Sequence, residues 1–368
     1  MKSHPMRIGI LGCANIARQF ARDVRPSRAV RIDAVASRDA AKAAAFAKDI
    51  GVQRKHGSHG SYEALLADPD IDAVYIPLPN NLHAQWAILA AQHFKHVLCE
   101  KPLALSKAQA LTMFEAARAH GVVLLEGYPY WFQPQTGALV DLLQSGAIGE
   151  VRSVQACFGF TVGNPQHNIR MKPELGGGAL LDAGSYPLSL IRLVMGEAPQ
   201  RVLAQSQWID QHGDGRGVDI STVATLLYAN GRVAQMSCAM NAANHRYATI
   251  VGSAGTIETE YLNHTGPGPG MAPGYLPSRM RLRRGIANTI PFEHIASGMG
   301  SGFRFCAEAF AKLVSSRDFA AMERAAQASI DIASTLEAIA RSARSGQVEN
   351  VAPSARQALA GGRQLQNK

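Results

Sequence analysis

The sequence has few cysteines and no long hydrophobic run. Its five cysteines, among 368 residues, are odd in number and never stand in a C-x-x-C pair, so neither a disulfide framework nor a zinc site is indicated. No stretch approaches the ~18 uninterrupted apolar residues of a membrane-spanning helix, and residues 1–7 lack the apolar core of a secretion signal. We therefore expect a cytoplasmic protein with reduced thiols, no bound metal and no membrane partner.

Acidic residues are fewer than basic residues. Asp and Glu number 28 against 37 Lys and Arg, which gives a formal net charge of +9 and favours an anionic partner: nucleic acid, acidic lipid or a phosphorylated cofactor. The densest basic segment, residues 279–284, alternates arginines with other residues, as on the exposed face of a strand. Aromatic residues are not interleaved with it, and no nucleic-acid-reading motif is present. We therefore expect no nucleic-acid partner.

The length and composition fit a folded protein of two domains. A chain of 368 residues with 47% hydrophobic and 18% charged residues is typical of that class. In the first third, apolar runs alternate with helical patterns, which predicts an α/β fold with a parallel, doubly wound sheet. Strands are expected at 7–11, 30–36, 71–76, 96–99 and 122–125, and helices from residue 16 and at 40–48, 83–93 and 106–120.

The first expected strand ends in a turn typical of dinucleotide-binding folds. The segment GCANIA at 12–17 takes the place of a G-x-G-x-x-G/A fingerprint, with alanine at the second glycine. It lies between a strand and a helix, where a pyrophosphate binds against the free N–H groups of the helix N-terminus. We therefore predict cofactor contacts from Gly12, Ala14, Asn15 and Ile16. The methyl group of Ala14 is expected to hold the phosphate slightly further out than in a strict fingerprint.

The end of the second expected strand indicates which cofactor binds. An NAD site would place Asp or Glu about 20 residues after the glycine turn, to hold the ribose 2′-hydroxyl. Here the sequence has Ala36, Ser37 and Arg38. An arginine beside a hydroxyl can bind a 2′-phosphate bidentately, and the NAD-type carboxylate that would repel this phosphate is absent from the strand end. We therefore predict that Ser37 and Arg38 select NADP over NAD.

Four later segments carry a family resemblance. They are PLPNNLH at 77–83, EKP at 100–102, LQSGAIG at 143–149 and GGGALLDAGSY at 176–186. Taken with the N-terminal turn, their order and spacing resemble the glucose–fructose oxidoreductase, inositol dehydrogenase and rhizopine catabolism (Gfo/Idh/MocA) family over nearly the whole chain.

This resemblance implies two domains. A Rossmann domain at residues 1–127 would bind the nicotinamide cofactor, and an α+β domain at residues 128–368, built on an open, mainly antiparallel sheet, would bind the substrate. One face of that sheet would cover the cofactor, and the other would form a homodimer or homotetramer. The sequence agrees, because strand-like segments follow one another at 202–208, 222–228, 233–238 and 247–251, and helical patterns return at 303–313 and 322–343.

The resemblance also implies a catalytic lysine. In the family, the lysine of the Glu-Lys-Pro segment lies near the nicotinamide and the substrate oxygen, so Lys101 is expected to position and polarise that oxygen. Its bond to Pro102 is expected to be cis. The family pattern also places Leu78, Asn81, His83 and Glu100 beside the cofactor, although a histidine at a helix start can equally serve as a cap.

Asp182 and Tyr186 are the further catalytic candidates. They are four residues apart, so on a helix both side chains meet one ligand. The resemblance implies that Tyr186 transfers the proton and that Asp182 binds a substrate hydroxyl and orients Lys101, whose ammonium would favour the phenolate. Gly184 between them costs about 1 kcal/mol in a helix, so a ligand or a neighbouring element must approach its backbone.

The substrate pocket is expected to draw on the segment that enters the second domain. Many relatives carry a basic residue there, whereas this chain has Tyr130, Trp131 and Gln133; Arg170 is expected to reach the same pocket. Aromatic faces with hydroxyl and amide groups suit a carbohydrate-like substrate, a sugar or cyclic polyol, and equally suit an aromatic dihydrodiol.

Three functions follow from these residues. The first is an NADP-dependent oxidoreductase that transfers hydride to or from a secondary alcohol or ketone of a sugar or cyclic polyol. The second is a trans-dihydrodiol dehydrogenase. The third is a regulatory protein that binds the cofactor without catalysis, against which the joint presence of Lys101, Asp182 and Tyr186 argues.

Overall fold

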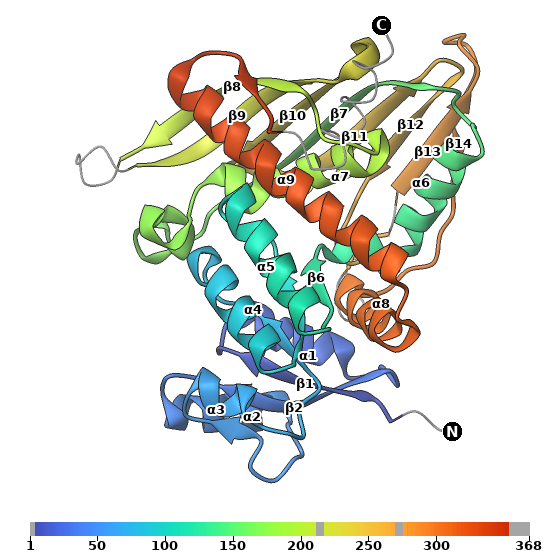
Figure 1. The fold of residues 1–368 in the computed structure, drawn as a ribbon. Coiled ribbons are helices and arrows are strands. Elements are labelled where there is room, and N and C mark those ends of the chain that lie inside the picture. Colours follow the sequence, from blue (N-terminus) through green and yellow to red (C-terminus); the bar gives the residue numbers. More distant parts are fainter. Residues whose placement is uncertain (1–3, 211–216, 269–274, 278, 353–368) are drawn as a thin grey trace, which may run out of the picture.

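The protein is built around two β-sheets that lie one above the other in Figure 1. The computed structural model describes residues 4–210, 217–268, 275–277 and 279–352. The smaller sheet has six strands and the larger has nine. The α/β class and the two-sheet architecture expected from the sequence are confirmed.

The smaller sheet is parallel and has the strand order β3-β2-β1-β4-β5-β6. This is the doubly wound Rossmann order, in which ligands bind where the order reverses, between β1 and β4. Its strands are β1 (Met6–Leu11), β2 (Val30–Ala36), β3 (Ser58–His59), β4 (Ala73–Ile76), β5 (His96–Glu100) and β6 (Leu124–Gly127). Its helices are α1 (Asn15–Val24), α2 (Ala40–Ile50), α3 (Tyr62–Leu66), α4 (His83–Gln92) and α5 (Lys107–Ala119).

Side chains fix three of these helix starts; at α3 the Ser61 hydroxyl accepts a hydrogen bond from the Ala64 N–H. The Asp39 carboxylate accepts a hydrogen bond from the Lys42 N–H at the start of α2, and the Ser106 hydroxyl accepts one from the Gln109 N–H at the start of α5. Each bond satisfies a backbone donor that a helix N-terminus leaves without a partner. The helix expected at 106–120 thus has Ser106 as its N-cap.

The larger sheet has the order β14-β13-β12-β11-β7-β10-β9-β8-β15 and is antiparallel except where β7 pairs with β10. Its strands are β7 (Val151–Thr161), β8 (Arg201–Ile209), β9 (Val218–Leu227), β10 (Val233–Ala239), β11 (Asn241–Gly252), β12 (Gly255–Glu260), β13 (Arg279–Arg284), β14 (Glu293–His294) and β15 (Glu349–Asn350). The later helices are α6 (Pro134–Gln144), α7 (Ser185–Met195), α8 (Gly302–Ser316) and α9 (Phe319–Ser345).

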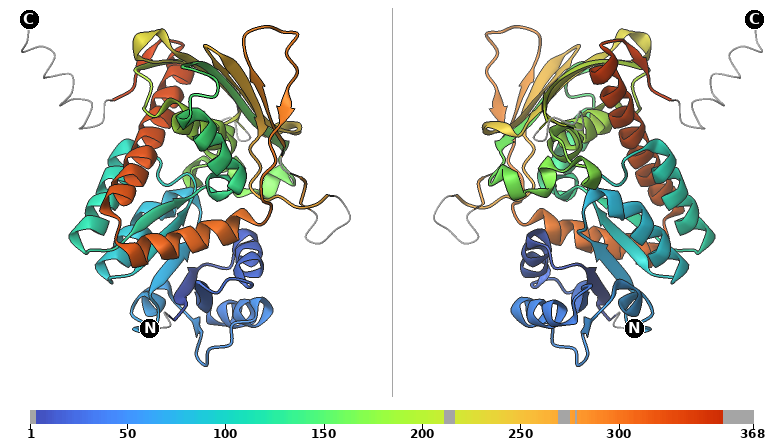
Figure 2. Two further views of the ribbon diagram at one scale, coloured as in Figure 1. Left: turned by 90° about the vertical axis from the view of Figure 1, so that its right-hand side faces the viewer. Right: turned by 90° about the vertical axis from the view of Figure 1, so that its left-hand side faces the viewer.

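Helices cover the larger sheet on one face only, in the part of the chain that the structure describes (Figure 2). The last two helices then return to the first domain, where α8 packs on α1 and α9 packs on α5. Phe303 and Phe310 of α8 join the core above Phe20 of α1, and Ile330 of α9 joins the core beside α4 and α5. Residues from the C-terminal third of the chain therefore complete the core of the first domain.

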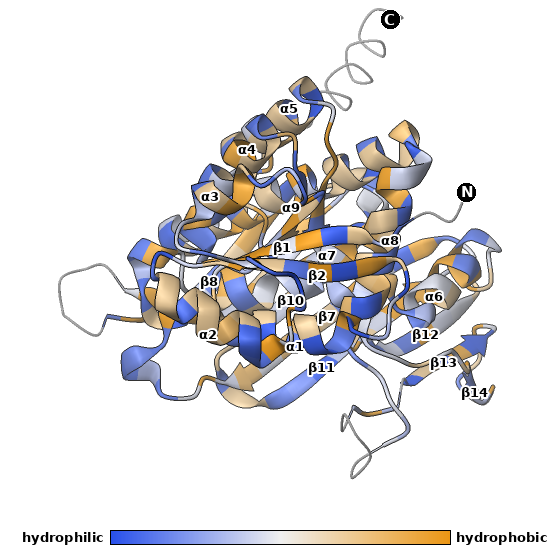
Figure 3. Ribbon diagram, turned by 90° about the horizontal axis from the view of Figure 1, so that it is seen from below, coloured by the Kyte–Doolittle hydropathy of each residue, from blue (hydrophilic) through white to orange (hydrophobic). Residues whose placement is uncertain are grey.

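The arginine-rich segment forms β13, near one margin of the larger sheet, where its hydrophilic residues are visible in Figure 3. Three of its four arginines pair with carboxylates of neighbouring strands: Arg279 with Glu260, Arg281 with Glu258 and Arg284 with Glu293. These pairs are typical of a solvated strand face.

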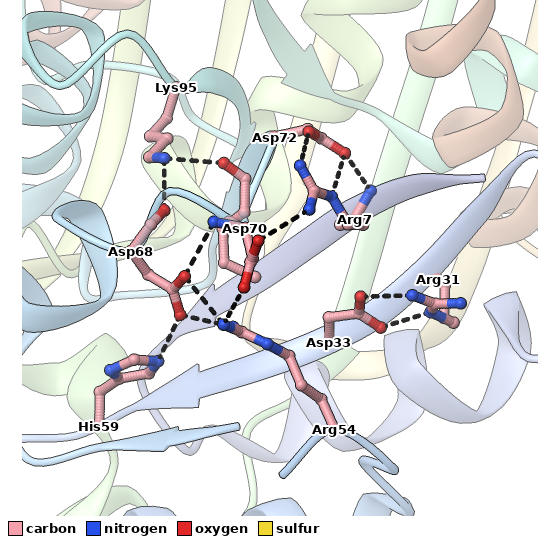
Figure 4. A network of polar contacts seen from close by, with 10 residues as sticks. Arg7, Arg31, Asp33, Arg54, His59, Asp68, Asp70, Asp72 and Lys95 are labelled. Carbon is pink, nitrogen blue, oxygen red and sulfur yellow. Dashed lines mark hydrogen bonds and ion pairs between the residues drawn. The ribbon is translucent and has the colours of Figure 1, made fainter. Parts of the chain in front are cut away.

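A second group of ion pairs lies in the first domain, on strands and loops of the smaller sheet (Figure 4). Arg7 at the start of β1 binds Asp72 just before β4, with Nη2 and Oδ1 2.7 Å apart, and Arg54 binds both Asp68 and Asp70. These pairs join neighbouring loops of the sheet and stabilise the Rossmann domain.

Candidate active site

A cleft of about 640 Å³ lies between the two domains, at the carboxyl edge of the smaller sheet. The first domain contributes the turn after β1, the loop after β4 and the end of β5. The second contributes β7, the loop before α7, α7 itself and the segment after β12. In an open α/β sheet this is the place where ligands bind.

The turn after β1 fits the pyrophosphate of a dinucleotide. Gly12 has φ +104°, and a Cβ there would lie 2.9 Å from the Leu78 side chain, so both conformation and space require glycine. Ala14 is the N-cap of α1 and makes no side-chain hydrogen bond to the helix, while Asn15 and Ile16 line the cleft with it. An uncapped helix N-terminus that faces a cleft suits an anionic phosphate.

The end of β2 fits a ribose 2′-phosphate. Arg38 is exposed, and the Ser37 hydroxyl next to it accepts a hydrogen bond from the Asp39 N–H. The carboxylate of Asp39 accepts the Lys42 N–H of α2 and is therefore occupied as a helix cap. An arginine stands where an NAD site would place its carboxylate, in agreement with the expected preference for NADP.

The loop after β4 holds the domains together beside the cleft. Asn80 donates from Nδ2 to the Gly176 carbonyl at 2.8 Å, and Asn81 donates to the Glu174 carbonyl at 3.0 Å. Leu78 and Asn80 line the cleft, whereas Asn81 does not. Asn81, predicted to contact the cofactor, thus joins the first domain to the loop before α7.

His83 lies beneath this loop and is fully buried. Its two ring nitrogens are each 2.9 Å from a backbone carbonyl, Nδ1 from that of Pro102 and Nε2 from that of Leu78. Burial lowers the pKa of the imidazole. His83 therefore fixes the two loops that carry Leu78 and Lys101, and it does not line the cleft.

The Glu-Lys-Pro segment follows β5 and brings Lys101 to the centre of the cleft. The bond between Lys101 and Pro102 is cis, as predicted. The Lys101 ammonium donates to Oδ1 and to the backbone carbonyl of Asp182, both at 2.9 Å, and lies 4.8 Å from the ring centre of Tyr186. Glu100 is buried behind it and accepts the Tyr75 hydroxyl at 2.6 Å.

Asp182 binds two cations at once. Arg170 donates from Nε to Oδ2 at 2.6 Å, while Lys101 binds Oδ1. Burial opposes the charged form of Asp182, but the two cations outweigh it and lower the pKa to about 2. Burial likewise opposes the charge of Lys101, and Asp182 outweighs it and raises the pKa of the ammonium. All three groups are therefore charged at neutral pH.

A single turn of π-helix, Leu180–Gly184, presents Asp182 before α7 begins. The Asp219 carboxylate accepts the Leu180 N–H at 2.7 Å and anchors the start of this turn. A Cβ on Gly184 would lie 2.9 Å from Cys238 Sγ on β10, so close packing against the sheet explains the glycine. The π-turn and α7 bring Asp182 and Tyr186 into the same cleft, as the spacing predicts.

A hydrogen bond within the second domain holds the phenol group of Tyr186. Asn263 donates from Nδ2 to the phenol oxygen at 3.0 Å, and the side chain of Tyr186 is largely buried. Asn263 is itself fixed, because Gln133 Nε2 donates to its backbone carbonyl at 2.8 Å. The phenol therefore faces the cleft in one orientation.

Three residues predicted to bind the substrate lie behind the cleft and do not line it: Tyr130, Trp131 and Gln133. A short 3-10 turn, Pro129–Phe132, directs the ring of Tyr130 into the core of the second domain, where its hydroxyl is 2.7 Å from Ser189 Oγ. Trp131 packs against the same core. The segment supports the pocket from behind, and of the predicted substrate residues Arg170, Asp182 and Tyr186 line the cleft.

Several cleft residues were not predicted from the sequence. Phe158 and Phe160 point to the cleft from β7, and their spacing of two residues is the strand signal that could have shown a shared face. Asn263 and His264 follow β12 in a segment without a motif. The sequence pattern indicates Asn81 as the cleft residue, whereas its neighbour Asn80 lines the cleft. Burial lowers the pKa of His264 to about 4, so this cleft residue is neutral at physiological pH.

Two features are absent from the described residues. No helix in this part of the chain has the length and apolar character needed to cross a membrane. No group of three or more His, Cys, Asp or Glu side chains in it is arranged to hold a metal ion.

Comparison with known proteins agrees with this geometry. Residues 6–128 match the "Oxidoreductase family, NAD-binding Rossmann fold" and residues 137–258 match the "GFO/IDH/MocA C-terminal domain". A D-xylose 1-dehydrogenase (NADP(+)) of Haloferax volcanii is 34% identical over 343 residues, 93% of this chain and 98% of that protein. A trans-1,2-dihydrobenzene-1,2-diol dehydrogenase of Danio rerio is 35% identical over 257 residues, 69% of this chain and 74% of that protein.

A solved structure shares the whole architecture. The crystal structure of a 3-ketoreductase from Actinomadura kijaniata in complex with NADP and TDP-benzene superposes with a TM-score of 0.78 at 31% identity, over 92% of this chain and 98% of that one. Both halves of the chain thus match one family, in the order that the sequence motifs predict. The chain belongs to the Gfo/Idh/MocA family of oxidoreductases.

Proposed function

We propose that this protein is an NADP-dependent oxidoreductase that transfers hydride between the nicotinamide and a secondary alcohol or ketone of a sugar or cyclic polyol. The observation that carries the proposal is the meeting of Lys101, Asp182 and Tyr186 in one cleft beside the dinucleotide turn. The NADP-dependent xylose dehydrogenase and the NADP-bound 3-ketoreductase among its relatives support the same chemistry.

The side chains of the cleft divide the work. Lys101, held by Asp182, polarises the reacting oxygen. Arg170 binds Asp182 through Nε, and its remaining N–H groups donate to other oxygens of the substrate. During oxidation the substrate O–H bond breaks and its proton moves to Tyr186 Oη, as the C–H electron pair leaves as hydride and a carbonyl forms. The bound cofactor supplies the hydride acceptor.

The cleft wall also favours a second substrate class. Phe158 and Phe160 form an aromatic surface with ring centres 5.7 Å apart, and both line the cleft. Aromatic faces bind the apolar face of a sugar ring and equally an aromatic diol. The likeness to a dihydrodiol dehydrogenase keeps this alternative in the test.

Nicotinamide absorbance tests the proposal. The purified protein is mixed with NADP⁺ or NAD⁺ and with aldoses, cyclic polyols and aromatic dihydrodiols in turn. We expect turnover with NADP⁺ that Lys101→Met lowers about 10³-fold, while Lys48→Met on the exposed face of α2 leaves it unchanged. Turnover of dihydrodiols alone would establish the alternative, and cofactor binding without turnover on the panel would favour the regulatory function.

The cofactor preference is tested separately through Arg38. Its exposed guanidinium is proposed to bind the 2′-phosphate with Ser37, and a charge-assisted contact of this kind is worth about 1.5–3 kcal/mol. We expect Arg38→Ala to raise the dissociation constant of NADP⁺ at least about tenfold and to leave that of NAD⁺ unchanged. Equal weakening of both cofactors would contradict this role.

The uncovered face of the larger sheet is proposed to form a homodimer. Leu203, Val223 and Tyr247 on this face are 46%, 55% and 56% exposed, around a hollow of about 1020 Å³. Exposed apolar side chains on a sheet face that no helix covers are typical of an interface. Light scattering after gel filtration is expected to give a dimer, or a tetramer of such dimers, that Val223→Glu dissociates. A monomeric wild type would refute the interface.

The five cysteines are unpaired, and unpaired thiols are typical of a reducing compartment, so the cytoplasm is the proposed compartment.

A further inference from the structure

An arginine on β11 lies against the proposed proton-transfer residue, although no sequence motif includes it. The guanidinium carbon of Arg246 is 4.3 Å from the ring centre of Tyr186 and 4.9, 4.6 and 5.3 Å from the rings of Phe158, Tyr261 and Tyr130. Arg246 Nε is buried without a hydrogen-bond partner. Among the described residues no carboxylate forms an ion pair with it, and the titratable groups that favour its charge are tyrosines.

The positive charge of Arg246 is unfavourable at this buried position. Burial lowers the pKa of Arg246 in spite of the aromatic faces around it, because no carboxylate offsets the loss of hydration. A hydrophobic side chain of similar length would fill the same aromatic box without that cost. The charge itself therefore has a use other than packing.

Asn263 connects Arg246 to the phenol oxygen. Arg246 Nη2 donates to Asn263 Oδ1 at 3.1 Å, and Asn263 Nδ2 donates to Tyr186 Oη at 3.0 Å. Because a guanidinium has only donors, the amide oxygen must face Arg246 and the amide nitrogen must face the phenol. Tyr186 is thereby made an acceptor in this bond, which favours its anionic form.

The charges around Tyr186 are unequal in sign. Three cations face it: Lys101 from the end of β5, Arg170 from the loop before α7 and Arg246 from β11. Two carboxylates lie among them: Asp182, on the preceding turn, is ion-paired with both Lys101 and Arg170, and Glu100, at the end of β5, also acts on these two cations. The other titratable neighbours are the phenols of Tyr75, Tyr128 and Tyr130. Arg246 is thus the cation of this group whose charge has no carboxylate partner in the described structure.

We propose that Arg246 is a positioning residue that, through Asn263, sets Tyr186 for proton transfer. Its charge stabilises the phenolate that accepts the substrate proton, and its hydrogen bond fixes the amide that holds the phenol oxygen. The inference deepens the proposed function and rests on Tyr186 as the proton acceptor. The residue acts through Tyr186 and does not itself line the cleft.

Two measurements test this role in Arg246→Met and Arg246→Lys. The first is the pH dependence of kcat/KM for alcohol oxidation; the second is the tyrosinate absorbance of Tyr186, taken as the difference between each protein and the same protein with Tyr186→Phe. We expect Arg246→Met to move both midpoints upward by at least about one pH unit, and Arg246→Lys to restore most of the shift. The absorbance titration needs no turnover, so it distinguishes failure of this role from failure of the proposed function.

Matched variants separate positioning from packing. Asn263→Asp neutralises Arg246 and removes the donor to the phenol, so it is expected to raise both midpoints as well. Arg281→Met removes an exposed arginine that stacks on Phe292, 4.7 Å away on the margin of the large sheet, and should change neither midpoint. Retained NADP⁺ binding shows that a variant is folded. Midpoints in folded Arg246→Met that equal those of the wild type would overturn the proposal and leave the arginine a structural role.

Discussion

Two clusters of charged residues in this protein differ in how their charges are balanced. In the first domain, Arg7, Arg31 and Arg54 each pair with an aspartate (Figure 4). In the cleft, by contrast, Asp182 and Glu100 act on Lys101 and Arg170, and Arg246 has no carboxylate partner among the described residues. The first arrangement leaves little charge unsatisfied, whereas the second leaves a positive field directed at Tyr186.

The difference separates charges that hold the fold from charges that act on a ligand. A cation matched by a nearby carboxylate contributes to stability and is largely insensitive to what binds elsewhere. An excess of buried cations is costly for folding, but it is of use where negative charge forms during a reaction, on a phenolate or on the reacting oxygen. Removing one carboxylate from each cluster should therefore have different consequences: a loss of activity in the cleft and a loss of stability in the first domain.

Among the carboxylate substitutions, Asp182→Asn in the cleft is expected to have the largest effect. The substitution removes the anion that holds Lys101 and Arg170, so both cations repel each other and Lys101 loses its fixed position. We expect kcat to fall about 10²-fold, because small displacements of a positioning group cost that much. Steady-state kinetics with the best substrate of the panel measure it. A kcat within threefold of the wild type would show that Asp182 does not position Lys101.

A smaller effect, on stability alone, is expected from Asp68→Asn in the first domain. Asp68 is 9% exposed and accepts two hydrogen bonds from Arg54, which lower the pKa of its carboxyl group. The unfolding free energy should fall by about 2 kcal/mol at neutral pH with kcat unchanged. Because the folded pKa is lowered, the contribution of Asp68 is present above its unfolded pKa of about 4 and disappears as the pH falls below it.

Chemical denaturation of Asp68→Asn and of Asp70→Asn gives the matched comparison. Asp70 belongs to the same cluster, but its side chain is 60% exposed, so its loss should cost at most about 0.5 kcal/mol. Equal costs for the two substitutions would mean that burial does not decide the strength of these pairs. A loss of kcat in Asp68→Asn would join the two clusters functionally and remove the distinction between them.

The catalytic cluster was predictable from the sequence where local pattern carries it. A strand that ends in Gly12, a Glu-Lys-Pro segment after β5 and a spacing of four between Asp182 and Tyr186 each place a group at an element end or on one helix face. Those positions follow from local backbone geometry, whereas the catalytic roles expected of Lys101 and Tyr186 were implied by the family resemblance. Lys101, Asp182 and Tyr186 accordingly meet in the cleft.

The rest of the site depends on contacts between distant segments. Arg246 and Asn263 are 17 residues apart in the chain and reach Tyr186 because β11 lies beside β7 in the sheet. Gln133 was predicted as a substrate ligand from its place after β6, yet it turns inward to hold Asn263. Register and turn geometry decide such positions, and no spacing in the sequence reports them.

The smallest effect concerns a buried carboxylate that has no cation bound to it. Glu126, on β6, is 2% exposed; Oε1 accepts the Leu103 N–H, Oε2 has no partner, and burial raises the pKa to about 7. Because the folded pKa lies above the unfolded one, its proton stabilises the fold at low pH, and this contribution is lost as the pH rises through about 7.

Glu126→Gln keeps the acceptor for Leu103 without the charge and should raise the unfolding free energy at pH ~8 by at least about 1 kcal/mol. At pH ~4, below the unfolded pKa of the carboxyl group, the gain should vanish. Exposed Glu115→Gln on α5 is the control, expected to be neutral at both values. A gain of equal size at both pH values would assign it to packing, whereas a gain confined to high pH would show that an uncompensated buried charge costs stability wherever no reaction uses it.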